Sequence, residues 1–298
     1  MDIVSQLYNQ PQISVDEQVR LLKSEGLSFQ NERRAMHLLE NISMFRMKSY
    51  LKPFRQHQGN RFKDASTFED AYNVYRFDAE LRKMVCSELE KIEVSFRTQL
   101  SLVMGNAAGI YWFENALNFR DVNRHASLLH SLSEELHRSD DDAIVAFRRN
   151  YSNPFPPTWM TFEVSSFGTL SMMYRYLNAG QARRQFARFY GLSDTVMESW
   201  LHSIVYVRNI CAHHSRLWNR RLGINAMIPR RTYLPFIEIP RDTKRVYYVL
   251  GIILYFLQTV NPNNTFASRF KTLLAKYPHI DADAMGFPAN WEDNLLWT

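Results

Sequence analysis

TFEDAYNVYRFDAELRKMVCSELEKIEVSFRTQLSLVMG, residues 67–105, predicts one long helix. Its large apolar side chains recur at steps of three and four residues, which is the spacing of one face of an amphipathic helix. These residues are Phe77, Leu81, Val85, Leu89, Ile92, Phe96 and Leu100. Thr67 followed by Asp70 resembles a capping box with a shortened acid and marks the first turn. We expect the helix to end near Gly105–Gly109.

Helical periodicity extends over most of the remaining chain. We expect further helices over Val15–Ser24, Asn31–Leu51, Asp121–His137, Asp140–Tyr151, Val164–Asn178, Ala182–Tyr190, Ser193–His214, Asp242–Val260 and Thr265–Lys276. Two segments interrupt the pattern. The prolines of SNPFPPTW, residues 152–159, indicate a turn or an extended segment, and LGINAMIPRRTYLPFIEIP, residues 222–240, indicates an irregular loop or a short hairpin. The pattern predicts an all-α fold.

The chain length and composition indicate a folded globular protein. Its 298 residues, 46% of them hydrophobic, can bury a substantial core. A polar stretch near residue 60 suggests an N-terminal helical segment, residues 1–60, packed on a helical domain of residues 61–298, or one continuous domain. The first nine residues lack the pattern of a signal peptide. The apolar stretch Val246–Val260 is shorter than the roughly 20 residues a spanning helix needs, so we interpret it as a buried core helix and expect no membrane association.

The cysteines and the basic residues narrow the class further. Two cysteines, Cys86 and Cys211, fit a reducing compartment and exclude a disulfide scaffold, so we expect a cytoplasmic protein. The 36 basic residues divide into 27 arginines and 9 lysines. Arginine is favoured where bidentate contact with phosphate matters, which favours a nucleic-acid partner, although arginine-rich codon usage would give the same count.

RNICAHHSRLWNR, residues 208–220, carries the candidate chemistry. RNA can be cut without a metal if one group removes the proton of the 2′-hydroxyl, another protonates the leaving 5′-oxygen, and a cation stabilises the phosphorus oxygens. Histidine suits the proton transfers and arginine suits the cationic role. The catalytic candidates are therefore Arg208, Asn209 and His213, with Asn209 orienting either partner. Candidate RNA-binding residues beside them are His214, Arg216, Arg220 and Arg221.

Helix geometry complicates a site within one chain. Five residues turn an ideal helix by about 500°, which leaves Arg208 and His213 about 140° apart. A distorted helix end, or counterparts from a second copy of the chain, would bring the groups together, and the single motif per chain favours the dimer. Capping of a helix C-terminus by these cations is the alternative explanation. A zinc site at CAHH is disfavoured by the close spacing of Cys211, His213 and His214, so we expect no metal.

The charged residues of the long helix and the single residue Glu163 are interpreted as structural and not as catalytic. In the long helix, acidic and basic residues alternate as on a solvated face. These residues are Glu88, Glu90, Glu93, Lys83, Lys91 and Arg97. Glu163 lies in a strongly apolar segment, where a carboxylate needs a partner, and we expect an internal ion pair with an arginine.

Three ordered blocks resemble the Abi family of bacterial abortive-infection proteins, the AbiD/AbiF-like group. They are FEDAYNVYRFDAELRKMVCSELEKIEVSFRTQL (68–100), PPTWMTFEVSSFGTLSMMYRYL (156–177) and RNICAHHSRLWNR (208–220). LLENISMFRMKSYLKPF (38–54) resembles that family's first helical segment, although ISMFRMKSY has Met and Phe where the family often has tyrosines. The similarity extends over most of the chain.

The resemblance implies the HEPN superfamily: a helical bundle, here with additional N-terminal and inserted helices, whose R-N-x-x-x-H motif forms a metal-independent ribonuclease site across a homodimer. Arg208, Asn209 and His213 match this motif in order and spacing, and His214 is common beside it. Family members are linked to phage defence, act as toxins, and in some cases are inhibited by a small RNA encoded nearby.

We therefore expect a homodimeric endoribonuclease that needs no cofactor, acts on RNA, and has a small regulatory or antitoxin RNA as a further partner. Two alternatives remain open at this stage. One is a non-catalytic RNA-binding protein that holds a structured RNA on the same basic surface. The other is a helical scaffold in which the motif supports a dimer interface.

Overall fold

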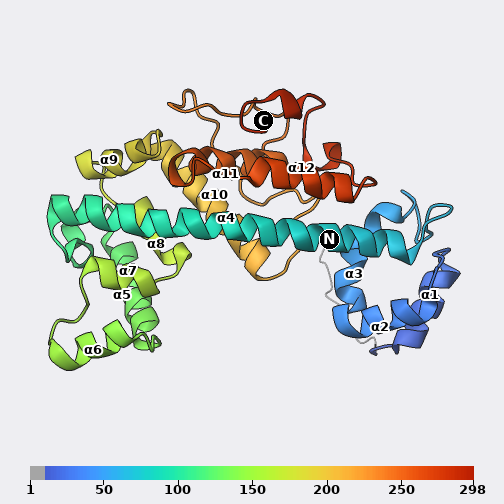
Figure 1. The fold of residues 1–298 in the computed structure, drawn as a ribbon. Helices are drawn as coiled ribbons and strands as arrows, with labels where there is room; N and C mark the ends of the chain where they lie inside the picture. Colours follow the sequence, from blue (N-terminus) through green and yellow to red (C-terminus); the bar gives the residue numbers. More distant parts are fainter. Residues whose placement is uncertain (1–10) are drawn as a thin grey trace, which may run out of the picture. The chain divides into compact units, whose positions relative to one another are not determined.

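A computed structural model describes residues 11–298 of the chain and shows helices joined by loops (Figure 1). The helices are α1 Val15–Ser24, α2 Glu32–Ile42, α3 Met44–Leu51, α4 Phe68–Ala108, α5 Val122–His137, α6 Asp142–Asn150, α7 Thr158–Val164, α8 Phe167–Tyr176, α9 Gln181–Phe189, α10 Asp194–Ala212, α11 Val246–Val260 and α12 Phe266–Lys276. Within these described residues there is no sheet, and the few β-bridges are isolated. The prediction of an all-α fold is confirmed.

The long helix α4 forms as its periodicity predicts. All seven apolar residues that define its predicted face, from Phe77 to Leu100, are at most 2% exposed. The predicted cap is reciprocal: the Thr67 hydroxyl accepts the amide N–H of Asp70 at 3.1 Å, and the Asp70 carboxylate accepts the amide N–H of Thr67 at 3.0 Å. These bonds satisfy N–H groups that the first helical turn would otherwise leave unpaired.

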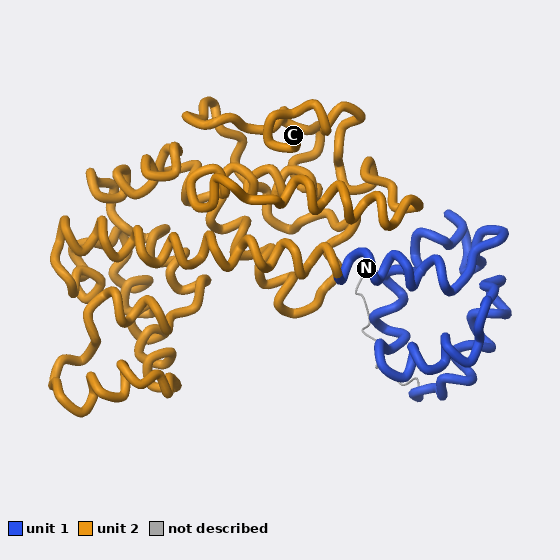
Figure 2. Tube along the Cα trace, in the orientation of Figure 1, with its two compact units in different colours: residues 1–79 blue, residues 80–298 orange. Residues whose placement is uncertain are grey.

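The chain divides into two compact units, residues 1–79 and 80–298, with the boundary inside α4 (Figure 2). The first unit packs α1 to α3 and the start of α4 around a small core. In this core the Tyr50 hydroxyl donates to the carboxylate of Asp78 at 2.6 Å, which provides a partner for a fully buried acid.

The single helix predicted over Asn31–Leu51 is wrong, because α2 ends at Ile42 and α3 begins at Met44. Ser43 between them has a φ of 66°, and its hydroxyl accepts the amide N–H of Arg46. A serine hydroxyl that bonds a nearby backbone N–H competes with continuation of a helix.

The second unit is built around α10 and α11. Helix α10 contacts α8, α9 and α11, and α8 contacts α5. All residues of α11 from Val246 to Leu257 are buried, which confirms that this apolar stretch is a core helix. Among residues 11–298, no helix combines the length and apolarity needed to cross a membrane.

Of the two interrupting segments, residues 152–159 differ from their prediction and residues 222–240 match one of the two predicted alternatives. Pro157 serves as the N-cap of α7, so a helix begins inside the segment predicted to be a turn or extended, and α8 starts later than predicted. Residues 222–240 form an irregular loop with no hairpin. The carbonyl oxygen of Met227 attaches this loop to the core, because it accepts the indole N–H of Trp200 at 2.8 Å and the hydroxyl of Tyr248 at 2.9 Å.

Gly251 in α11 allows the loop to approach this helix closely. A Cβ at this position would lie 2.8 Å from Cγ1 of the buried Ile237 and nearer still to its Cδ1. We expect Gly251→Ala to lower the free energy of unfolding by about 1–3 kcal/mol through overpacking, measured by urea denaturation.

Two comparisons separate this clash from a general effect of glycine replacement. Gly105→Ala in α4, where the nearest neighbouring atom is 3.9 Å away, is expected to be neutral or to raise stability by up to about 1 kcal/mol. The Gly251→Ala penalty should shrink in an Ile237→Ala background. An equal penalty in both backgrounds would contradict the packing explanation.

Candidate active site

The motif residues lie at the solvent-facing C-terminal end of α10. The helix is anchored along its inner side by Trp200, Ile204 and Val207, each fully buried. It ends at Ala212, and the C-cap residue His213 donates its backbone N–H to the carbonyl of Asn209 at 3.0 Å. Asn209 and His213 are exposed, and the side chain of Arg208 is 38% exposed. The chain therefore presents all three predicted residues at one accessible helix end.

The structure brings two of the three side chains together. Nη1 of Arg208 lies 3.5 Å from Oδ1 of Asn209, at the outer limit of a hydrogen bond. The ring of His213 forms no hydrogen bond or ion pair with any residue between 11 and 298. Arg208 and Asn209 are thus associated within one chain, while the imidazole of His213 remains available to solvent.

A buried carboxylate on α4 holds Arg208. Oε2 of Glu93 lies 3.5 Å from Nε of Arg208, and its other oxygen pairs with Arg97, four residues further along α4. Arg97 also donates to the carbonyl oxygens of Phe162 and, at 2.7 Å, Ser165. These contacts link α4, α7 and the motif. Glu93 and Arg97 are each only 9% exposed, so water screens their ion pair weakly.

The interpretation of these acidic residues as a solvated face is therefore wrong in part. Glu90 is exposed, but Glu88 is fully buried and pairs with Arg269 of α12 and with Lys91. A local signal was present: Glu93 stands four residues after Leu89 and three before Phe96, on the apolar face. The alternation of acidic and basic residues around Glu93 led to its interpretation as an exposed residue.

The neighbouring RNA-binding candidates have different environments. His214 is exposed and has a φ of 54°, in the left-handed region, where the chain leaves the helix. The guanidinium of Arg220 donates to the carbonyl of Arg216 at 3.1 Å. Arg221 forms an ion pair with Asp242 at 3.2 Å, which partly neutralises it. Arg216 is half-buried, so the four residues differ in exposure as well as in partners.

Glu163 does not form the internal ion pair that we expected. It is exposed, and no hydrogen bond or ion pair of its carboxylate exists within residues 11–298. Its backbone carbonyl accepts a long bond of 3.3 Å from Arg97. The adjacent Phe162 is buried, so α7 turns the apolar side chain inward and the carboxylate outward.

The two cysteines meet beside the motif. Cys86 of α4 and Cys211 of α10 are both unbridged. A hydrogen bond from the Cys211 thiol, opposed by desolvation and assisted by the charges of Arg208 and Arg82, lowers the pKa of Cys86 to about 7. A fraction of Cys86 is then a thiolate at neutral pH, close to the candidate site.

We expect alkylation of Cys86 by iodoacetamide to report this pKa. The rate should rise with pH and reach half its maximum near pH 7, whereas an ordinary thiol reaches that point near pH 8.5 or so. Cys211→Ala should move the midpoint upward, because it removes the donated hydrogen bond. Mass spectrometry of the labelled peptide measures the rate at Cys86 alone, and an unchanged midpoint in the variant would refute the pairing of the thiols.

Comparison with known proteins places this chain. A family model described as Abi-like protein matches residues 37–219. The chain belongs to the Abi-like protein family. The match begins within α2 and extends past the end of α10, so the motif of this Abi-like chain lies inside the matched region, while α1, α11 and α12 lie outside it. Comparison with curated proteins gave no match, and comparison with solved structures gave none.

Proposed function

We propose that this Abi-like protein is a metal-independent HEPN endoribonuclease of bacterial anti-phage defence, toxic to the cell when released from inhibition. One observation carries the proposal. Arg208 is held next to Asn209 by the buried carboxylate of Glu93, at the same exposed helix end as the unpartnered imidazole of His213. A cation held by a buried partner at the same helix end as an accessible general acid or base suits phosphodiester cleavage.

The roles follow from the chemistry of each group. The 2′-oxygen attacks phosphorus and loses its proton to a base, and the bond from phosphorus to the 5′-oxygen breaks as that oxygen gains a proton. His213 serves as one of the proton-transfer groups, because an imidazole can accept a proton on one ring nitrogen and donate one from the other. Arg208 stabilises the charge on the phosphorus oxygens, and Asn209 positions the reacting groups. The products are a 2′,3′-cyclic phosphate and a 5′-hydroxyl.

A homodimer completes the proposed site. The reaction needs two proton-transfer groups, and each chain supplies one R-N-x-x-x-H motif. A two-fold dimer places the same surface of both copies against each other, so two motifs would face one phosphate. Glu93 acts as a positioning residue, since it contacts Arg208 and no reacting atom in this scheme.

RNA is the proposed substrate, and a small structured RNA encoded nearby is the proposed inhibitor. The alternative function is non-catalytic binding of such an RNA, which the exposed Asn209, His213 and His214 would also permit. An RNA-bound latent nuclease would combine both.

Incubation of the purified full-length protein with end-labelled RNAs in excess EDTA tests the proposal. We expect cleavage products that carry 2′,3′-cyclic phosphates, and a dimer by light scattering. RNA binding without cleavage would favour the alternative function. Neither binding nor cleavage, from a preparation free of nucleic acid, would favour a helical scaffold.

A further inference from the structure

A second basic site lies at the opposite end of α10 from the motif. A pocket of about 780 Å³ opens beside the first turn of this helix, at Ser193 to Val196. Arg208 follows Val196 by twelve positions, which corresponds to about 18 Å along an α-helix. The pocket is therefore separate from the candidate active site, and nothing in the proposed cleavage reaction uses it.

Four arginines line the pocket from two distant segments. Arg184 and Arg188 belong to α9, and Arg230 and Arg231 belong to the irregular loop. All four are exposed, and none forms an ion pair within residues 11–298. Unpaired arginines that converge on one concave surface repel one another, and an anion with several charges relieves this repulsion.

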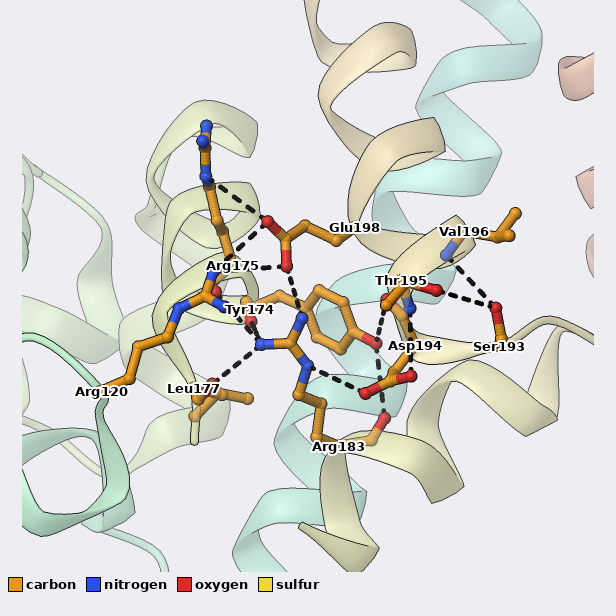
Figure 3. A network of polar contacts seen from close by, with 10 residues as sticks. All are labelled: Arg120, Tyr174, Arg175, Leu177, Arg183, Ser193, Asp194, Thr195, Val196 and Glu198. Atoms are coloured by element: carbon orange, nitrogen blue, oxygen red, sulfur yellow. Dashed lines mark hydrogen bonds and ion pairs between the residues drawn. The ribbon is translucent and has the colours of Figure 1, made fainter. Parts of the chain in front are cut away.

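The carboxylate that lines the pocket already forms an ion pair with an arginine outside the pocket lining. Asp194 lies 3.6 Å from the buried Arg183, which also pairs with Glu198 (Figure 3). The same network holds the N-terminus of α10, where the Ser193 hydroxyl accepts the amide N–H of Val196 at 3.4 Å. Backbone N–H groups at this helix end add a positive partial charge to that of the arginines.

Apolar and aromatic side chains form the rest of the wall. Met227 and Ile228 are 46% and 51% exposed, and Tyr233 is 74% exposed. The guanidinium of Arg231 lies over the ring of Tyr233 at 5.7 Å from its centroid. Planar guanidinium and phenol groups are surfaces on which a nucleobase stacks. The volume is that of a small-molecule pocket, whereas single-stranded nucleic acid occupies an extended groove.

We propose that this pocket binds a nucleoside polyphosphate, with its phosphates on the four arginines and its base against the wall formed by Met227, Ile228 and Tyr233. Charge and shape carry this assignment together. The arginines match a ligand with several negative charges, and the apolar wall matches one planar base. The proposal does not depend on ribonuclease activity.

Calorimetric titration of the full-length protein in EDTA tests the proposal, with ATP, GTP, inorganic triphosphate and adenosine as probes. We expect ATP or GTP to bind more tightly than inorganic triphosphate, and adenosine to bind weakest. The paired variants R184A/R188A and R230A/R231A should each weaken nucleotide binding by about 10- to 100-fold, as expected for loss of charge-assisted hydrogen bonds. The matched control R33A/R149A removes two exposed arginines elsewhere and should leave affinity unchanged.

Three results would overturn the proposal. The first is no measurable nucleotide binding by a protein that melts cooperatively. The second is equal affinity for ATP and inorganic triphosphate, which would show that the base does not contribute to binding in the pocket. The third is binding of a 2′-O-methyl RNA of about ten nucleotides through the four arginines without binding of ATP, which would make the pocket an RNA contact. The 2′-O-methyl groups prevent cleavage, so this outcome is independent of the proposed nuclease.

Discussion

Arg208→Ala and His213→Ala are each expected to lower the rate of RNA cleavage in EDTA by about 100- to 10,000-fold. General acid–base catalysis and stabilisation of developing charge each contribute rate factors of this order. Both side chains are accessible at the end of α10, and when Arg208 is removed its buried partner Glu93 keeps the ion pair with Arg97. The cleavage rate under single-turnover conditions is the measurement, with thermal denaturation as the check on folding.

Surface substitutions provide the matched controls for these variants. Arg149→Ala and His57→Ala remove an exposed arginine and an exposed histidine elsewhere in the chain, and both should cleave at the wild-type rate. Glu93→Gln keeps the shape of the positioning residue but removes its charge, so Arg208 loses its ion pair and the rate should fall by a smaller factor. Wild-type cleavage by both motif variants would show that the activity arises elsewhere.

Mixing wild-type chains with His213→Ala chains tests the composite site. If both motifs act on one phosphate, a dimer that contains one variant chain has lost one of the two proton-transfer groups. After random exchange of subunits in an equal mixture, only the dimers with two wild-type chains should cleave at the full rate, which leaves about a quarter of the activity of the same amount of wild-type protein. Retention of about half of that activity would instead show that each chain works independently.

Arg183→Ala is expected to cause the largest loss of stability, about 3–5 kcal/mol, because it breaks a buried ion-pair network. The side chain is 5% exposed and joins three helices: it pairs with Glu198 and Asp194 of α10, and from α9 it donates at 2.8 Å to the carbonyl of Leu177, at the end of α8 (Figure 3). Alanine removes the ion-pair partner of Asp194, whereas Glu198 keeps its weaker contacts with Arg120 and Arg175 at 3.3 and 3.5 Å. For a unit of 219 residues, residues 80–298, the loss corresponds to a fall in melting temperature of roughly 6–20 °C.

The adjacent arginine supplies the control for this prediction. Arg184 stands on the same helix but is exposed, and it has no ion pair within the described chain. Arg184→Ala should change the free energy of unfolding by no more than about 0.5 kcal/mol. Equal melting temperatures for Arg183→Ala and the wild type would contradict the assigned role of the network.

Secondary structure was the most predictable property of this chain. An α-helix pairs each backbone group with one four residues away, so its signal is contained in a short window of sequence. The prediction for Val15–Ser24 matches α1, and the predicted face of α4 is buried throughout. The errors, at Ser43 and at the start of α7, are positions where a single side chain or a proline alters the backbone locally.

The exposed motif residues were also predictable, because Arg208, Asn209 and His213 are close in sequence and follow an apolar helix. The partner of Arg208 was not. Glu93 precedes it by more than a hundred residues, and its burial follows from the packing of α4 against other elements of the second unit. The spacing of residues along the chain does not predict a contact between segments that are so far apart in sequence.

Sequence pattern alone thus established the helical class, the core face of α4, the buried character of α11 and the location of the motif. Tertiary structure decided which charges are buried, that Cys86 meets Cys211, and that arginines of α9 and of the loop after α10 line one pocket. The physical reason is the same in each case. Helices form through local hydrogen bonds, whereas burial and charge pairing depend on which distant segments the fold brings into contact.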